Sequence, residues 1–119
     1  MDAARRALNI DSSLAEAHSA AAMIRHFYDW DRAAAEKEFK LAIALNPNYA
    51  IAHKGYGQFL SLEGRFEEAI SETRRARELD PLSPMILSVT GFPFENSGRY
   101  DQASERYTKG LEMDPRVMP

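Results

Sequence analysis

The chain has 119 residues, of which 45% are hydrophobic and 28% are charged, values that are ordinary for a globular domain. Its formal net charge of −3 gives no electrostatic reason to expect nucleic acid or an anionic membrane as a partner. The sequence has no cysteine, which excludes disulfides, thiolate zinc sites and cysteine nucleophiles and fits a reducing, cytoplasmic location. Its apolar runs are too short for a membrane span or a signal peptide, so we expect neither.

The first predicted element covers residues 3–14. Its opening letters, "AARRALNID", match the end of a later helical segment, "RRARELD". We therefore predict a partial helix that belongs to a preceding structural unit. This interpretation makes the chain a fragment of a longer protein.

The next unit covers residues 15–48 and contains the letters "DWD", Asp29 to Asp31. Two carboxylates this close can suggest acid–base catalysis. However, they stand directly before the helical segment "RAAAEKEF", where an aspartate can cap the free N–H groups of the first turn. We predict that Asp29 or Asp31 caps this helix and that Trp30 packs over the turn.

The unit at residues 50–83 has the clearest helical pattern. Small or apolar residues recur at three-and-four spacing in "AIAHKGYGQFLSLE" and again in "RFEEAISETRRAREL". Gly64 lies between them, where a residue free to adopt positive φ ends the first helix. Pro81 ends the second helix, and Ser83 is placed to cap the following helix with Pro84 in its first turn.

The unit at residues 84–117 breaks the pattern at one position. Pro93 falls inside its first helical segment, "PMILSVTGFPFENS". Proline has no N–H to donate to the carbonyl four residues earlier, that of Val89, and its ring clashes with the preceding turn. We therefore predict a kink in this helix at Pro93.

These units repeat with a fixed period. Pro47, Pro81 and Pro115 are equally spaced, and "EGRFEEAI" returns one period later as "SGRYDQAS". A fixed period of about 34 residues is typical of helical hairpins that stack in series. The pattern predicts an all-α protein, an α-solenoid of antiparallel helix hairpins.

The sequence resembles the tetratricopeptide repeat family over nearly its whole length. The matching residues of the second unit are Ala50, Ala52, Gly57, Gly64, Phe66, Ala69, Ile70, Ala76, Leu79 and Pro81. The resemblance implies one domain, residues 1–119, with repeats at 15–48, 50–83 and 84–117 after the partial helix at 3–14. The first repeat is looser: it has "FYDWDR" where the glycine turn belongs, and its turn holds one extra residue.

The resemblance also implies a function. Stacked hairpins curve, and the first helix of each repeat lines the concave groove. This makes the chain a non-catalytic protein–protein interaction module that binds a partner peptide or helix. The groove-facing residues that the family pattern implies are Glu16, Ser19, Met23, His26, Phe27, Ile51, Lys54, Gln58, Ser61, Leu62, Met85, Ser88, Phe92, Glu95 and Asn96.

Enzyme and cofactor functions find no support in the sequence. It has no phosphate-binding glycine loop, nucleophile elbow or zinc-protease helix. His18 and His53 stand at equivalent places in adjacent repeats, where we expect them to pack between helices rather than to bind a metal. We therefore predict no catalytic residue, no cofactor and no metal site.

Three other hypotheses concern the partner. The array is similar to those in bacterial signalling proteins, such as winged-helix regulators, cyclases and kinases, so the chain could be a regulatory segment whose activity lies elsewhere. Helical repeats of this length also bind RNA, but a groove with one lysine argues against it. A homodimer is compatible with either role, through a C-terminal end that exposes Tyr107 and Leu111. The sequence names neither the partner nor the pathway.

Overall fold

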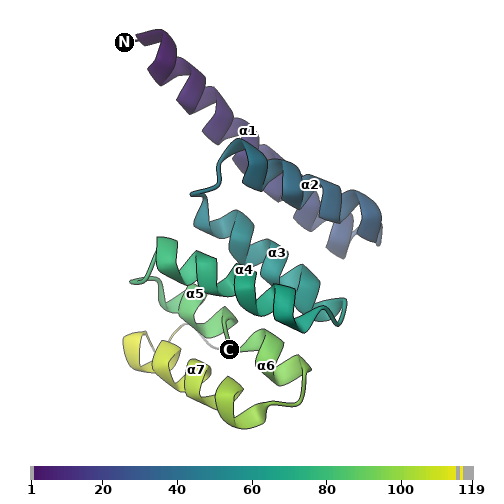
Figure 1. Cartoon of the computed structure of the whole chain (residues 1–119), viewed down its shortest axis with the longest axis vertical. Coiled ribbons are helices and arrows are strands. Elements are labelled where there is room, and N and C mark those ends of the chain that lie inside the picture. The colour runs from purple at the N-terminus through teal and green to yellow at the C-terminus, as the bar shows by residue number, and fades with distance from the viewer. Residues whose placement is uncertain (1, 115, 117–119) are drawn as a thin grey trace.

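The computed structural model is a series of stacked helices (Figure 1). It describes the backbone of residues 2–114 and 116 and the side chains of residues 13–114 and 116, so Pro115 and Val117 of the third predicted repeat lie outside it. All of the regular structure in this part is helical. Its helices are α1 (Asp2–Phe27), α2 (Arg32–Leu45), α3 (Ala50–Leu62), α4 (Phe66–Leu79), α5 (Pro84–Val89), α6 (Phe92–Asn96) and α7 (Tyr100–Met113).

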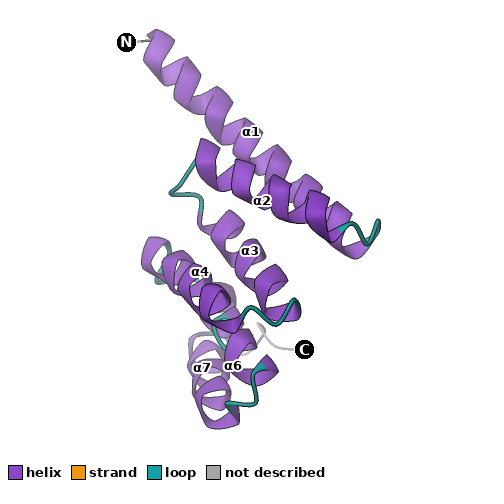
Figure 2. Cartoon of the chain, turned by 45° about the vertical axis from the view of Figure 1, so that its right-hand side comes forward, coloured by secondary structure: helices purple, strands orange, loops and turns teal. Residues whose placement is uncertain are grey.

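The helices pair into three antiparallel hairpins that stack in series (Figure 2). α1 packs against α2, α3 packs against α4, and α7 packs against both α5 and α6. Each predicted repeat therefore contains one hairpin, and the prediction of an all-α solenoid is confirmed. None of the described helices combines the length and the apolar composition that crossing a lipid bilayer requires.

Side-chain caps and prolines set the helix ends, as the sequence predicts. Asp31, rather than Asp29, caps α2, because its Oδ1 accepts a hydrogen bond from the Ala34 N–H at 3.1 Å. Ser83 caps α5 by accepting from the Ile86 N–H at 3.2 Å, and Pro84 follows it. These bonds satisfy N–H groups that have no partner inside their own helix.

The N-terminal helix differs from the prediction. Residues 3–14 do not form a separate helix but join the first helix of repeat 1 in one element of 26 residues. The physical reason is the missing stop signal: the later second helices end at Asn46-Pro47 and Asp80-Pro81, whereas Asp11 has no proline after it. Without a proline, the backbone hydrogen bonds continue through the expected boundary.

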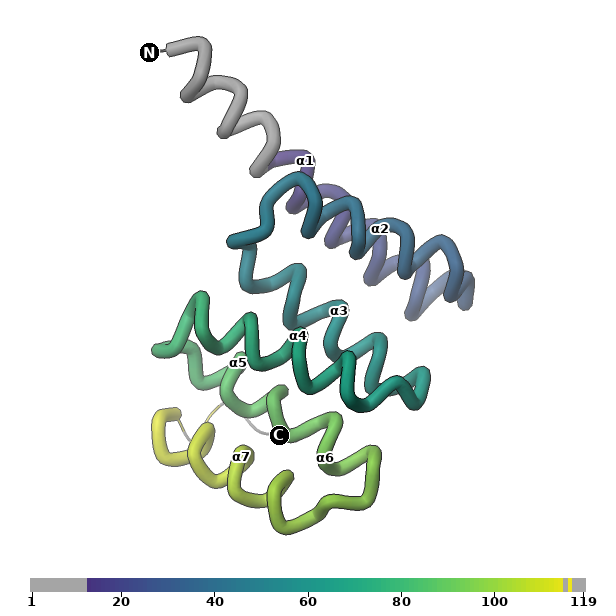
Figure 3. Tube along the Cα trace, in the orientation of Figure 1, coloured from purple at the N-terminus to yellow at the C-terminus, as the bar shows by residue number. Residues whose placement is uncertain are grey.

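The first helix of the third repeat is interrupted before Pro93, which confirms the predicted kink. α5 ends at Val89 and α6 begins at Phe92, with a bend in the chain trace between them (Figure 3). The backbone tightens before the break, because the Gly91 N–H donates to the Ser88 carbonyl three residues earlier, at 3.0 Å. The helix restarts when Gly91 accepts from the Glu95 N–H at 2.9 Å.

Small residues let the two helices of a hairpin approach closely. In the α3–α4 hairpin, a Cβ atom added to Gly57 would lie 2.5 Å from Cγ2 of Thr73 and 3.3 Å from its backbone nitrogen. Ala69, one turn away on α4, is fully buried. The aromatic core surrounds this crossing and includes Phe59. No larger side chain fits at Gly57 unless the helices move apart.

We predict that Gly57→Ala destabilises the chain, although alanine favours helix formation. The added methyl group overlaps a buried threonine, so we expect the free energy of unfolding to fall by about 1–2 kcal/mol. Thr73→Ser removes the overlapping Cγ2. Urea unfolding of the two single variants and the double variant should therefore give a smaller loss for Gly57→Ala in the Thr73→Ser background. Equal losses in both backgrounds would contradict the proposed overlap.

Candidate functional site

The first helices of the hairpins form one continuous face. α3 contacts α1, α5 and α6, so consecutive first helices pack directly against one another. Within the described chain, no comparable contact joins α2 to α4 or α4 to α7. The first helices therefore lie closer together than the second helices. We call the surface of α1, α3, α5 and α6 the inner face and that of α2, α4 and α7 the outer face.

Six large apolar side chains are exposed on the described part of the inner helices: Leu14 and Ile24 on α1, and four others on α1, α3 and α5. Phe27 ends α1 and is 51% exposed, and Met85 in α5 is 55% exposed. Ile51 and Leu62, at opposite ends of α3, are 50% and 58% exposed. These four others all belong to the groove set that the family pattern predicts. Each hairpin therefore presents at least one apolar group that a partner could contact.

Two of these side chains border a hollow of about 320 Å³ at the turn end of the first two hairpins, which we call the turn-side hollow. The hollow is mainly apolar, but an ion pair crosses it, with Nη1 of Arg32 3.4 Å from Oε2 of Glu63. Burial lowers the pKa of His26, which lies at the edge of the hollow. The lining residues are His26, Phe27, Trp30, Arg32, Leu62 and Glu63.

Trp30 has an unusual backbone conformation. Its φ of 56° is the only positive value among the described non-glycine residues. Gly64 and Gly98 stand one and two repeat periods later, with φ values of 79° and 83°. Trp30 thus occupies the place of the turn glycine, where a side chain is strained. The prediction that it packs over the turn is wrong, because its side chain is 82% exposed.

The extra residue predicted in this turn is visible in its hydrogen bonds. In the later turns, the N–H groups of Arg65 and Arg99 donate to carbonyls five residues earlier, at 2.9 and 2.7 Å. The corresponding bond in the first turn runs from the Asp31 N–H to the carbonyl of Arg25, six residues earlier, at 2.9 Å. The longer loop carries the aromatic side chains of Tyr28 and Trp30 outward, where both are exposed.

Three predicted groove residues are buried instead. Ser19, Ser61 and Ser88 are at most 4% exposed. Ser61 accepts a hydrogen bond from Nδ2 of Asn96 at 2.6 Å, so it joins α3 to α6. Ser88 faces Gly110 on α7, where an added Cβ would overlap the Ser88 hydroxyl oxygen. Ser61 and Ser88 lie where helices meet, and all three serines are too buried to line the inner face.

The remaining predicted residues divide between packing and exposure. Met23 is half-buried against the core, and the ring of Phe92 lies edge-on to Tyr107 with centroids 6.3 Å apart. Burial lowers the pKa of Lys54, whose Nζ lies 3.8 Å from Sδ of Met85. Gln58 is half-buried, whereas Glu16, Glu95 and Asn96 are exposed.

Of the two residues predicted to be exposed at the C-terminal end, Tyr107 and Leu111, only Leu111 is exposed. Leu111 is 39% exposed on α7. Tyr107 is half-buried and donates a hydrogen bond to Glu95, and burial together with this bond raises its pKa. The sequence pattern identified the apolar character of these positions but not the partner that α6 supplies to the tyrosine.

Comparisons with known proteins agree with this architecture. Small glutamine-rich tetratricopeptide repeat-containing protein 2 of Mycosarcoma maydis is 35% identical over 85 residues, which cover 71% of this chain and 24% of that protein. Type IV pilus assembly protein PilF of Pseudomonas aeruginosa is 32% identical over 117 residues, which cover 92% of this chain and 44% of that protein. The chain therefore spans less than half the length of these curated relatives.

Solved structures also show this helical repeat architecture. Two crystal structures of MamA superpose with a TM-score of 0.73 at 26% identity, and the matches cover 88% and 92% of this chain and 61% and 59% of those chains. No family model matches the sequence. The chain belongs to the tetratricopeptide repeat family. As a tetratricopeptide array, it has the architecture of a protein–protein interaction module.

Two histidines of the tetratricopeptide hairpins pair with glutamates on the partner helix. His18 bonds Glu38 across the first hairpin, and Nδ1 of His53 lies 2.7 Å from Oε2 of Glu72 across the second. Nε2 of His53 also lies 2.7 Å from the carbonyl oxygen of Pro47. These contacts match the predicted packing role of the histidines. Among the described residues, no three histidine, aspartate or glutamate side chains are grouped to hold a metal ion.

Sequence reasoning missed three residues of the turn-side hollow. Trp30, Arg32 and Glu63 line it but are absent from the predicted groove set. A signal for Trp30 was present, because it is in register with Gly64 and Gly98. Arg32 and Glu63 belong to different hairpins, so only the structure brings them together.

We predict that Trp30→Gly leaves stability unchanged or raises it. Glycine removes a backbone strain of about 1–2 kcal/mol but adds up to about 1 kcal/mol of entropy to the unfolded chain. The exposed indole contributes little burial that could be lost. Trp30→Ala, which keeps the strained conformation, should be the less stable variant in urea unfolding. A loss above about 2 kcal/mol for Trp30→Gly would show instead that the indole packs.

We also predict a pH dependence that arises from His53. The hydrogen bond to Glu72 raises the folded-state pKa of His53 above the usual 6.5. Its contribution to stability is therefore complete below pH 6.5 and is lost as the pH rises through the folded pKa. His26, with its lowered pKa, contributes the opposite slope. The difference in unfolding free energy between the wild type and His53→Gln should thus shrink as the pH rises above 6.5, and a constant difference would contradict the assignment.

Proposed function

We propose that this chain is a non-catalytic interaction module that binds an apolar segment of a partner protein along its inner face. The observation that carries the proposal is the row of half-exposed side chains on the inner helices, Phe27, Ile51, Leu62 and Met85. Exposed apolar groups gathered on one face are typical of protein contact surfaces. The name of one relative, a pilus assembly protein, fits a module that acts on other proteins.

The turn-side hollow is the proposed anchor site. Tryptophan and other aromatic residues are enriched at positions that dominate binding energy. Trp30 is exposed despite its strained backbone, and strain that folding does not require is a feature of functional positions. An apolar side chain of the partner would fill the space between Phe27 and Leu62. The rest of the segment, helical or extended, would continue across Ile51 and Met85.

A peptide-selection experiment tests this proposal. Peptides selected from a random library against the wild-type chain should carry an apolar anchor residue. Because Trp30 is the only tryptophan, a selected peptide should shift its fluorescence emission to shorter wavelength. Leu62→Asp and Phe27→Asp should each weaken binding at least about tenfold, since burying an unpaired carboxylate is costly.

The control variant is Leu82→Asp. Leu82 is 82% exposed but lies in the turn between α4 and α5, away from the turn-side hollow. The Leu82→Asp variant should bind the selected peptides as tightly as the wild type does, and circular dichroism should show that all variants are folded. Peptides that bind Leu62→Asp and Phe27→Asp as tightly as the wild type would refute the inner face as the binding surface.

A second proposal is that the chain is a regulatory segment of a bacterial signalling protein and uses the same inner face. In that case the inner face would bind a segment of the signalling protein to which the array belongs. The sequence that flanks this chain in its gene distinguishes the two readings.

A further inference from the structure

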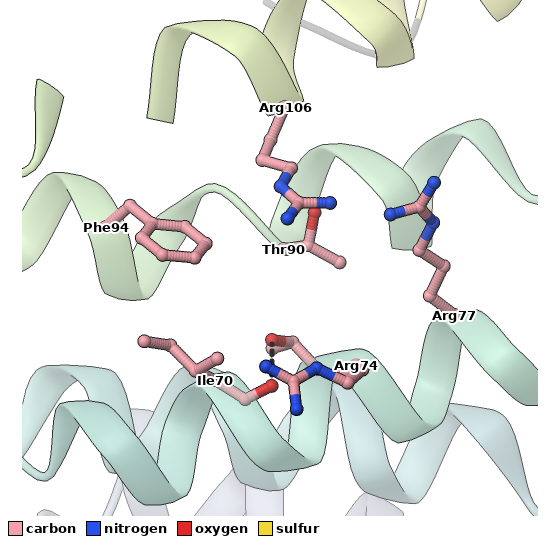
Figure 4. Close-up of a pocket in the computed structure, with 7 residues that line it drawn as sticks. Ile70, Arg74, Arg77, Thr90, Phe94 and Arg106 are labelled. Atoms are coloured by element: carbon pink, nitrogen blue, oxygen red, sulfur yellow. Dashed lines mark hydrogen bonds between the residues drawn. The ribbon is translucent and has the colours of Figure 1, made fainter. Parts of the chain in front are cut away.

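A second hollow lies on the outer face between the second and third hairpins (Figure 4). Its volume is about 200 Å³, and it spans the break between α5 and α6. Arginine side chains from α4 and α7 border it, and two apolar side chains lie beside them. We call it the arginine hollow; it is lined by Ile70, Thr73, Arg74, Arg77, Thr90, Phe94 and Arg106.

The repeat register explains why there is space here. The residues that precede Thr73 and Thr90 by one repeat period are Phe39 and Tyr56. Both are buried between the first and second hairpins, with ring centroids 5.8 Å apart. Between the second and third hairpins two threonines replace these two rings. The arginine hollow is the volume that the missing aromatic side chains would occupy.

The threonine hydroxyls do not need a ligand. Oγ1 of Thr73 donates to the carbonyl of Ala69 at 3.0 Å, and Oγ1 of Thr90 donates to the carbonyl of Leu87 at 2.5 Å. Both bonds return to the residue's own helix. The polar character of the hollow therefore comes from its arginines.

The register also explains the charge. In the first two hairpins a glutamate, Glu38 or Glu72, bonds the histidine of the partner helix. Arg106 stands one repeat period after Glu72, at the equivalent position of the third hairpin. The place of the histidine is taken by Leu87, which cannot bond it. A carboxylate and its partner have thus been replaced by a cation and an apolar group.

A second substitution adds to this charge. Arg77 follows Ile43 by one repeat period, so an apolar residue of the first repeat has become a cation. Arg74 lies one turn earlier on α4 and borders the same space. Arg106 reaches down from α7, with its guanidinium carbon 5.6 Å from the centre of the Phe94 ring. The result is a local concentration of positive charge on a chain whose net charge is −3.

The described side chains give these three arginines no direct ion-pair partner, although the charge of Glu105 acts on Arg106 and Arg77. Among the described side chains, none of them forms an ion pair, whereas Arg65 and Arg99 each do. Glu105 is bonded to Lys109 at 3.0 Å. That bond lowers the pKa of Glu105, and the charges of Arg106 and Arg77 lower it further.

We propose that the arginine hollow binds the phosphoryl group of a phosphate monoester. A phosphate monoester carries about −1.5 to −2 charges and three free oxygens at pH 7, which suits several guanidinium groups better than one carboxylate does. The carbon chain of the ester would lie against Ile70 and Phe94 on the apolar side. This site is on the outer face, so it is separate from the proposed peptide surface.

Calorimetric titration of the chain at constant ionic strength tests the proposal. The probes are O-phosphoserine, inorganic phosphate, serine and acetate. We expect O-phosphoserine to bind, and we expect Arg77→Gln and Arg106→Gln each to weaken it about tenfold or more, because each removes a charge-assisted hydrogen bond. A peptide that carries phosphoserine then distinguishes a phosphorylated protein from a free small ester as the source.

Two further variants make the test specific. Arg75→Gln removes a charge from the same helix, but Nη2 of Arg75 points to Oδ1 of Asn48 at 3.4 Å and not into the hollow. It should bind as the wild type does. Thr90→Tyr restores the residue type of the second repeat, so it should fill the hollow and block binding while all three arginines remain.

Three results would overturn the proposal. The first is acetate binding as tight as O-phosphoserine binding, which would mean that any anion suffices. The second is an equal loss in Arg75→Gln and Arg77→Gln, which would mean that net charge alone acts. The third is binding of inorganic phosphate without binding of O-phosphoserine, since the ester would then not fit.

Discussion

The stack depends on neighbouring helices, both within and between hairpins, approaching so closely that there is no room for a larger side chain at the contact. The requirement recurs along the stack. A Cβ added to Gly55 would lie 2.8 Å from the Phe39 ring, one at Gly57 would overlap Thr73, and one at Gly91 would lie 2.9 Å from the Tyr107 ring. Close contact excludes water and brings dispersion attraction to both helices. It also fixes the angle at which the next hairpin is added, so the shape of the array follows from its smallest residues.

The two hollows arise where single positions depart from the repeat while the backbone follows it. Trp30 takes the conformation of the turn glycine, so the turn still forms but carries a large apolar side chain into solvent. Thr73 and Thr90 take the places of two core aromatics, so the helices still pack but leave a space between them. In both cases the backbone keeps the conformation of the repeat, and the substituted side chains determine which groups line the hollow.

Much of the fold could be predicted from the sequence because its signals are local. A proline after Asp80, a serine before Pro84 and a glycine at position 64 each act within one or two turns. The uninterrupted α1 was missed because the N-terminal letters share the composition of a helix end but lack the proline that follows α2 and α4.

The surfaces were harder to predict because they depend on contacts between repeats. Family register placed Leu62 and Met85 on the inner face, and both are exposed. The same register placed Ser61 and Ser88 there, but α6 and α7 cover them. Helical periodicity gives the direction of a side chain with an error of about one position. At the edge of a helix face, that error decides between exposure and burial.

A repeat array can accommodate such departures because each hairpin contacts only its neighbours. Its stability is approximately a sum of terms for single repeats and for the interfaces between them. Losing the Phe39 and Tyr56 equivalents therefore weakens only the interface between the second and third hairpins. The bond from Asn96 to Ser61 and the ion pair between Arg99 and Glu67 still join these hairpins. A cavity that would weaken the entire core of a globular domain is here confined to one interface, which leaves the rest of the stack intact.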